Sequence, residues 1–307
     1  MSFALSTAWN AFRYDTAKGL LFEIKKLGFN DVELSFNLTA AMLKEIQVEA
    51  KEAGINITSL HNYCPIPEEF SRKEGLPDCF SVTSINEDER QLALKYTKRS
   101  IDNVSLLGAK ALVLHCGRVE IPDRTRQLID LYNLEGNKSA DFNKLKSEII
   151  KERRDNAGPF FKQALASLEE LNSYATKKKI LIGVETRFYY REIPILEEFS
   201  SIFDKFKGSN IFYWHDIGHA QLMENLGLIR HKDFLEITKG FLIGTHLHDI
   251  CGCSDHKPAG KGSIDFNIIK PFLKKDTTKV IEIHHPATGE EVVKAREYLS
   301  KILEDNG

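Results

Sequence analysis

The segment YWHDIGHAQ, residues 213–221, places a carboxylate beside two imidazoles directly after an apolar run. Asp216 and His219 are three positions apart, so both side chains can reach one small divalent cation. The same spacing is compatible with a polar turn, because an aspartate can also cap the first turn of a helix. The segment alone leaves both interpretations open, so the rest of the chain must decide between them.

Further metal-capable side chains occur at or near the ends of other short apolar runs. A single histidine at such a place is usually a hydrogen-bonded structural residue. A succession of them indicates a shared site, because buried carboxylates such as Glu185 and Glu282 are unfavourable without a cation. The set, besides Asp216 and His219, is Glu33, His61, His115, Glu185 and the residues of the two run ends THLHD (His246, His248, Asp249) and IEIHH (Glu282, His284, His285).

These side chains need a scaffold that brings together residues more than 200 positions apart. Eight β-strand-like runs alternate with amphipathic stretches of helical spacing, which predicts an α/β fold, a single (β/α)8 TIM barrel over residues 1–307. The carboxyl ends of its strands converge on one mouth, where the polar residues would meet. The runs are FALSTAW, DVELSF, NITSLH, ALVLHC, ILIGVET, IFYWHD, FLIGTHLH and KVIEIHH.

A doubly wound open sheet is the alternative architecture. It is disfavoured because the chain lacks both G-x-G-x-x-G after the first strand and a P-loop motif. Residues 62–85 and 117–143 follow strand ends and are expected to be loops that wall or cover the mouth. The charged runs KEIQVEAKEAG, KLKSEIIKERRD and TKKK are interpreted as solvated helix faces.

Composition narrows the expected partners and location. The 42 Lys+Arg and 44 Asp+Glu give a net charge of -2, so no overall attraction to nucleic acid or anionic membrane is expected. The N-terminus shows no signal peptide, and no apolar run is long enough for a membrane span. Five scattered cysteines indicate free thiols in a reducing compartment. We therefore expect a cytoplasmic protein with a small-molecule substrate, compatible with a homo-oligomer.

Seven motifs together resemble the xylose isomerase-like TIM barrels, a superfamily of sugar isomerases, ketose epimerases, inositol-catabolic enzymes and endonuclease IV. The resemblance runs along nearly the whole chain. It implies a divalent metal ion (Mn, Mg, Co or Zn) held by Glu185, Asp216, His246 and Glu282. His246 rather than His248 takes the ligand place, because His246 opens the family's H-x-x-D pattern. The motifs are SLHNY, VLHCG, GVETRFYY, WHDIGHAQ, IGTHLHD, DHKPAGKGSIDF and IEIHH.

The resemblance also implies an activity. It predicts an isomerase or epimerase that acts on a small sugar, sugar phosphate or polyol-like substrate through an enediolate. Glu185 and Glu282 would move the proton, while His219 would polarise the carbonyl oxygen. The remaining candidates, for a second metal or for substrate binding, are Glu33, His61, His115, Arg187 and His256.

An endonuclease IV-like phosphodiester hydrolase is the alternative function. His61, His115 and His256 fit the extra histidines of its three-zinc site, but Ser254 stands where that family has an aspartate, with Asp255 one position away. The loop of residues 62–85 is net acidic and would repel a phosphate backbone. DNA is therefore not the expected substrate.

Overall fold

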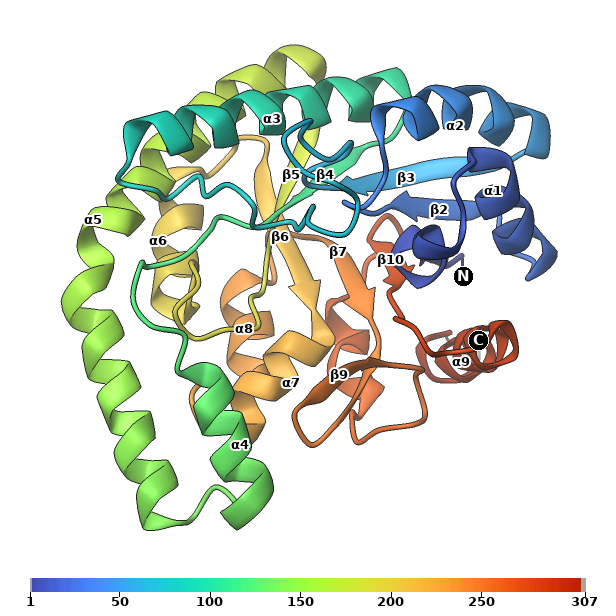
Figure 1. The fold of residues 1–307 in the computed structure, drawn as a ribbon. Helices are drawn as coiled ribbons and strands as arrows, with labels where there is room; N and C mark the ends of the chain where they lie inside the picture. Colours follow the sequence, from blue (N-terminus) through green and yellow to red (C-terminus); the bar gives the residue numbers. More distant parts are fainter. Residues whose placement is uncertain (1, 305–307) are drawn as a thin grey trace.

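The computed structural model describes residues 2–304, which contain a closed barrel of eight parallel strands (Figure 1). Each strand pairs with its sequence neighbour, and the last barrel strand closes against the first. The predicted TIM barrel is confirmed, and the open-sheet alternative is wrong. The barrel strands are β1 (Ala4–Ser6), β2 (Asp31–Leu34), β3 (Asn56–His61), β4 (Ala111–Leu114), β5 (Leu181–Glu185), β6 (Ile211–Asp216), β7 (Leu242–Leu247) and β10 (Thr278–Ile281).

Helices surround the barrel, and polar side chains cap several of their amino ends. Asn86 accepts hydrogen bonds from the backbone of Asp88 and Glu89, and Thr288 forms a reciprocal capping box with Glu291. The helices are α1 (Ala17–Lys26), α2 (Ala40–Ala53), α3 (Glu87–Leu106), α4 (Thr125–Glu135), α5 (Ala140–Lys178), α6 (Leu196–Lys205), α7 (Ile217–Asn225), α8 (His231–Thr238) and α9 (Gly289–Leu303), with short 3-10 turns at Thr7–Trp9, Ala11–Arg13, Phe266–Ile268 and Lys270–Phe272.

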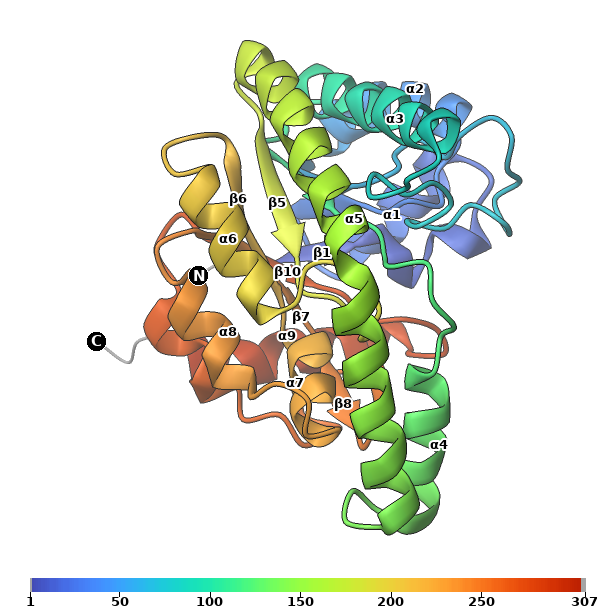
Figure 2. The same cartoon turned by 90° about the vertical axis from the view of Figure 1, so that its left-hand side faces the viewer.

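Two additions extend the barrel on the side of the strand carboxyl ends. The segment 117–143, expected to be a loop, contains α4, because buried side chains such as Leu128 pack this stretch into the core. Helix α4 and the first half of α5 form an arm that projects past the strands (Figure 2). After β7, the chain makes an antiparallel hairpin of β8 (Asp249–Cys251) and β9 (Ser254–Lys257). Both additions lie beside the mouth.

Trp214 occupies the interior of the barrel and is fully buried. Glycines on the two neighbouring strands make room for its indole ring. A Cβ atom at Gly183 would lie 2.9 Å from the ring, and one at Gly244 would lie 2.1 Å from it. The barrel is thus filled by one large side chain and small or β-branched neighbours, namely Ala4, Ala111, Val113 and Val280.

One position in a charged run is buried rather than solvated. Arg153 of α5 is 2% exposed, and its guanidinium donates two hydrogen bonds to the Glu198 carboxylate, at 3.0 and 2.7 Å. It also donates to the backbone oxygen of Glu192. The interpretation of KLKSEIIKERRD as a wholly solvated face is therefore wrong at Arg153, which ties α5 to the start of α6.

Two further features concern the cysteines and the helices. All five cysteines are free thiols. Within residues 2–304, none of the helices is long and apolar enough to cross a membrane.

Candidate metal centre

Four strand-end residues meet at the centre of the mouth, and we call them the central group: Glu185, Asp216, His246 and Glu282. The Nδ1 atom of His246 lies 2.6 Å from a Glu185 oxygen, 3.1 Å from a Glu282 oxygen and 3.7 Å from an Asp216 oxygen. All four side chains are buried, and their potential ligand atoms lie within 4.8 Å of one another. Three carboxylates and one imidazole suit a hard-to-borderline divalent ion.

The carboxylates of the central group are held in the charged form. Burial by itself would raise the pKa of Glu185 and of Glu282, but neighbouring imidazoles, above all His246, keep both pKa values well below the usual range. Burial opposes a charge on His246 as well, yet Glu282, Glu33 and Glu185 raise its pKa well above the ordinary value. The group therefore requires positive charge, which protons or a divalent ion can supply.

Glu33 lies behind His246 rather than facing the mouth. Its carboxylate accepts from His246 Nε2 at 2.9 Å, and Ser59 Oγ donates to its other oxygen at 2.7 Å. With the proton on Nε2, the Nδ1 lone pair of His246 points at the three carboxylates of the central group. Metal-binding histidines are commonly oriented by such a carboxylate. The donor directions of the central group thus fit a metal ion.

A second donor group adjoins the first and shares Glu185. Nδ1 of His61 lies 2.9 Å from the backbone oxygen of Asn62, and Nδ1 of His115 lies 3.1 Å from Asp78. Each Nδ1–H therefore has an acceptor. The two Nε2 atoms face the same Glu185 oxygen, His61 at 3.4 Å and His115 at 2.6 Å. We call His61, His115 and Glu185 the β3–β4 group.

A third group forms where the β8–β9 hairpin meets α7. His219 Nδ1 lies 3.0 Å from the backbone oxygen of Thr186, and its Nε2 lies 3.5 Å from Asp255. The same Asp255 carboxylate lies 3.1 Å from Nδ1 of His256. Ser254, where the sequence places the expected aspartate, is exposed. Asp255, one position away from the aligned place, therefore supplies the carboxylate that the family pattern expects beside the two histidines. We call His219, Asp255 and His256 the hairpin group.

His248 supports the central group from outside. The backbone N–H of His256 donates to His248 Nδ1 at 2.9 Å, so the ring proton is on Nε2 and is donated to Asp216 at 3.0 Å. Asp216 also accepts from the backbone N–H of His219 at 2.7 Å, which caps α7. Asp216 therefore both caps α7 and belongs to the central group, so the two interpretations of its spacing from His219 do not exclude each other.

Two residues of this region have roles that the sequence did not reveal. Asp78, from the segment 62–85, contacts both His115 and Arg187, and no motif marks it. Arg187 had been a candidate for binding a hydroxyl or phosphate. Its guanidinium instead lies against three carboxylates: Glu192 at 2.8 Å, Asp78 at 3.2 Å and Glu185 at 3.4 Å. Arg187 thus links the loop to the central group.

A hydrogen-bond chain begins behind the mouth, where it is buried, and ends at the surface. Tyr213 OH lies 2.7 Å from His215 Nδ1, and His215 Nε2 lies 3.0 Å from His231 Nε2. Burial lowers the pKa of His215 well below its ordinary value and that of His231 to about 4, so both rings are neutral. In order, the chain contains Thr186, Tyr213, His215, His231, Gln221, Asn225 and the backbone oxygen of Gly252 at the hairpin turn.

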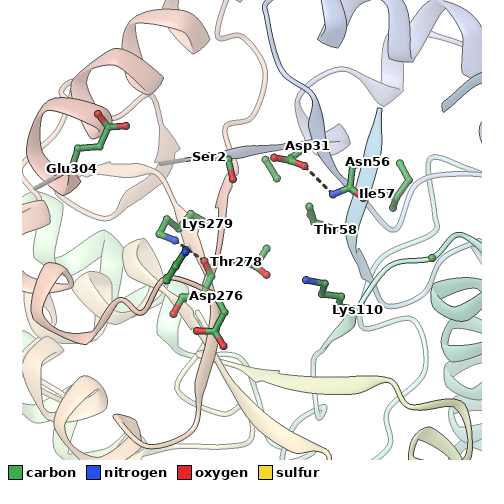
Figure 3. Close-up of a pocket in the computed structure, with 14 residues that line it drawn as sticks. Ser2, Asp31, Asn56, Ile57, Thr58, Lys110, Asp276, Thr278, Lys279 and Glu304 are labelled. Carbon is green, nitrogen blue, oxygen red and sulfur yellow. Dashed lines mark hydrogen bonds between the residues drawn. The ribbon is translucent and has the colours of Figure 1, made fainter. Parts of the chain in front are cut away.

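Concavities lie at both ends of the barrel. One of about 670 Å³ is at the amino ends of the strands, where Asn56 donates to Asp31 and Lys110 lines the wall (Figure 3). It contains none of the histidines. Another, of about 410 Å³, lies beside the hairpin group and includes His256 in its lining. The second concavity is therefore the one that adjoins the candidate metal centre.

Comparison with known proteins agrees with this architecture. Residues 21–302 match the family model described as a xylose isomerase-like TIM barrel. A D-tagatose 3-epimerase-like protein superposes with a TM-score of 0.70 at 21% identity, covering 99% of this chain and 97% of that one. The 3-keto-D-glucoside 4-epimerase from E. coli superposes with a TM-score of 0.69 at 17% identity, covering 98% of this chain and 99% of that one. An L-ribulose 3-epimerase superposes with a TM-score of 0.70 at 14% identity, covering 99% of this chain and 95% of that one. No curated protein matches by sequence.

Proposed function

The chain belongs to the xylose isomerase-like TIM barrel family, and on that premise we propose that it is a divalent-metal-dependent isomerase or epimerase of a small sugar, sugar phosphate or polyol-like substrate. The observation that carries the proposal is the central group, in which Glu185 and Glu282 approach His246 from different strands. The similar folds of solved sugar epimerases support it.

Proton transfer next to a carbonyl group is the chemistry that this geometry favours. A bound divalent ion would stabilise negative charge on the oxygens beside the reacting carbon. One glutamate, Glu185 or Glu282, removes a proton from that carbon as a carboxylate and gives an enediolate. The other must be protonated in the substrate complex, and it returns its proton to the neighbouring carbon or the opposite face; proton exchange with solvent then restores both glutamates. Glu282 has a second oxygen for this task, because only one of its oxygens faces His246 and His256. Both oxygens of Glu185 face histidines, so Glu185 would act through an oxygen that it shares with them.

His219 is placed to act on the carbonyl oxygen. Its Nδ1–H donates to Thr186, which leaves Nε2 directed toward the hairpin group. Burial disfavours a charge on this ring, but Asp216 and Asp255 raise its pKa, so Nε2 can carry a proton. A protonated Nε2 would donate a hydrogen bond to the developing oxyanion.

Metal analysis combined with a substrate panel tests the proposal. Glu185→Gln and Glu282→Gln should each abolish epimerisation of ketoses and lower the metal content, while circular dichroism stays unchanged because the barrel core lies below the mouth. Glu52→Gln, on the exposed face of α2, is the matched control and should behave as the wild type. Wild-type metal content and turnover in either mouth variant would contradict the assignment.

Phosphodiester hydrolysis is a second candidate, because donors for further ions adjoin the central group. His61, His115 and Glu185 form one such set, and His219 and His256 form another with Asp216 and His248. Metal stoichiometry separates the two. One equivalent per chain agrees with the isomerase, whereas two or three zinc ions, with one lost in His115→Ala, agree with the hydrolase.

Incision of an abasic-site duplex is a direct test of the hydrolase. We expect none at physiological salt with zinc or manganese, because the acidic loop 62–85 borders the mouth and repels the phosphate backbone. The basic Arg72 of this loop is directed at backbone oxygens of Ala11, Tyr14 and Asn37. Metal-dependent cleavage that disappears in His219→Ala would replace the isomerase proposal.

A further inference from the structure

The cavity of about 410 Å³ is formed by the loops that follow the seventh and eighth barrel strands. We call it the hairpin cavity. In TIM barrels these two loops frequently build a phosphate site. Its polar lining consists mainly of His256, Lys257, Lys261, His284, His285 and Glu291.

The hairpin cavity adjoins the candidate metal centre at His256. His256 lines it and also places its Nε2 atom 3.7 Å from Glu282. The ring of His284 stacks on His256 with centroids 3.7 Å apart and planes inclined by 5°. A substrate whose reacting carbon lies at Glu282 would therefore extend into this cavity.

The cavity carries two ammonium groups, and neither forms a close ion pair. Within residues 2–304, neither Lys257 nor Lys261 has a carboxylate within 4.0 Å. Two carboxylates do line the cavity, but each has other partners. Asp255 binds the two histidines of the hairpin group, and Glu291 accepts from the backbone and hydroxyl of Thr288. The hydrogen bonds from Thr288 lower the pKa of the Glu291 carboxyl, and Lys261 is near enough to lower it further, so a bound phosphate would compete with Glu291 for Lys261. Lys257 has no such neighbour among the carboxylates of the cavity.

The loop that carries Lys261 is fixed in place. The Asp249 carboxylate accepts hydrogen bonds from the backbone N–H groups of Gly260, at 2.9 Å, and Ile264, at 3.0 Å. A Cβ atom at Gly262 would lie 2.3 Å from the backbone oxygen of Ile250, so only glycine allows this close packing. The backbone that carries Lys261 is therefore already ordered before a ligand binds.

We propose that the hairpin cavity binds the phosphate group of a phosphorylated sugar through Lys257 and Lys261. A phosphate monoester carries about -1.5 to -2 charges near neutral pH, which matches two ammonium groups. This inference rests on the proposed function and narrows its substrate class to sugar phosphates.

Calorimetric titration of the metal-loaded chain with inorganic phosphate tests the cavity independently of turnover. The double variant Lys257→Gln/Lys261→Gln should bind phosphate roughly tenfold more weakly or worse, because two charge-assisted contacts are lost. Lys177→Gln/Lys207→Gln removes the same charge from exposed positions at the far end of the barrel and should leave the affinity unchanged. Equal affinities in all three proteins would overturn the proposal.

A kinetic comparison then identifies the anion. Ketopentoses, their 5-phosphates and the corresponding uronates are tested as substrates, and the ratio of kcat/KM for phosphate to free sugar should fall roughly tenfold in the Lys257→Gln/Lys261→Gln variant. Preference for the uronate, or an unchanged ratio, would overturn the phosphate assignment. If no sugar is turned over but phosphate affinity falls as expected, the proposed function fails and the anion site stands.

Discussion

The buried pair His215 and His231 should make the free energy of unfolding depend on pH. His231 is fully buried, and burial lowers its pKa from 6.5 to about 4. The unfolded chain therefore binds a proton between these two values that the folded chain does not. Stability from the neutral ring is complete above the unfolded pKa and is lost as the pH falls toward the folded pKa.

The structure sets the size of this effect. Linkage between the two pKa values gives a loss of about 2 kcal/mol at about pH 5, rising to about 3 kcal/mol at still lower pH. In His231→Gln the amide can still accept from His215 and donate to Gln221, but it does not titrate. This variant should therefore lose about 2 kcal/mol less than the wild type between about pH 7.5 and pH 5.

Urea unfolding of chelator-treated protein at the two pH values measures the difference. The free energy of unfolding of each protein is compared between the two pH values, so any cost of repacking around the substitution cancels. Metal is removed because release of a bound ion at acid pH would also lower the free energy of unfolding. His285→Gln is the matched control, because His285 is exposed and should leave the acid loss as in the wild type. Equal acid losses in the wild type and His231→Gln would refute the reasoning.

Three other substitutions have defined outcomes. Glu33→Gln should weaken metal binding roughly tenfold to a hundredfold in competition with a chelator, because the carboxylate that orients the ligand histidine loses its charge; unchanged affinity would remove that role. Gly244→Ala should lower the free energy of unfolding by about 1–3 kcal/mol through overpacking against the central indole, whereas Gly240→Ala, in open space, should not. Arg153→Met should lower the free energy of unfolding in urea by about 3–5 kcal/mol, because it leaves the Glu198 carboxylate buried without its partner. Adding Glu198→Leu should recover most of this loss, and an unchanged free energy in Arg153→Met would show that the ion pair does not stabilise the fold.

The barrel could be predicted because its signal is repeated along the chain. NITSLH and IFYWHD coincide with β3 and β6, and the other barrel strands lie inside their predicted runs, except that β10 begins one residue before KVIEIHH. Once the strands are placed, barrel closure brings their carboxyl ends together, so the meeting of Glu185, Asp216, His246 and Glu282 follows from topology. No detailed knowledge of side-chain packing is needed for that step.

Residues outside regular elements could not be placed in the same way. Asp78 reaches His115 from an irregular segment, whose path depends on tertiary contacts rather than on residue spacing. Asp255 replaces Ser254 because the hairpin backbone departs from a simple alternation, with His256 at a left-handed φ of 53°.

Arg153 is a different case, because its sequence position did carry a signal. It lies four residues from both Ile149 and Ala157, which are buried on the same face of α5. The spacing therefore predicts that Arg153 faces inward. It gives no information on its partner Glu198, which comes from another helix.

The indole inside the barrel gives the protein an internal optical reporter. Trp214 lies edge to face with His246, with ring centroids 5.4 Å apart, and it is sealed from solvent. Trp9 is the other tryptophan of the chain. In a Trp9→Phe background, the emission of Trp214 should be quenched when cobalt or manganese reaches His246, so occupancy of the centre can be followed by fluorescence without an attached dye.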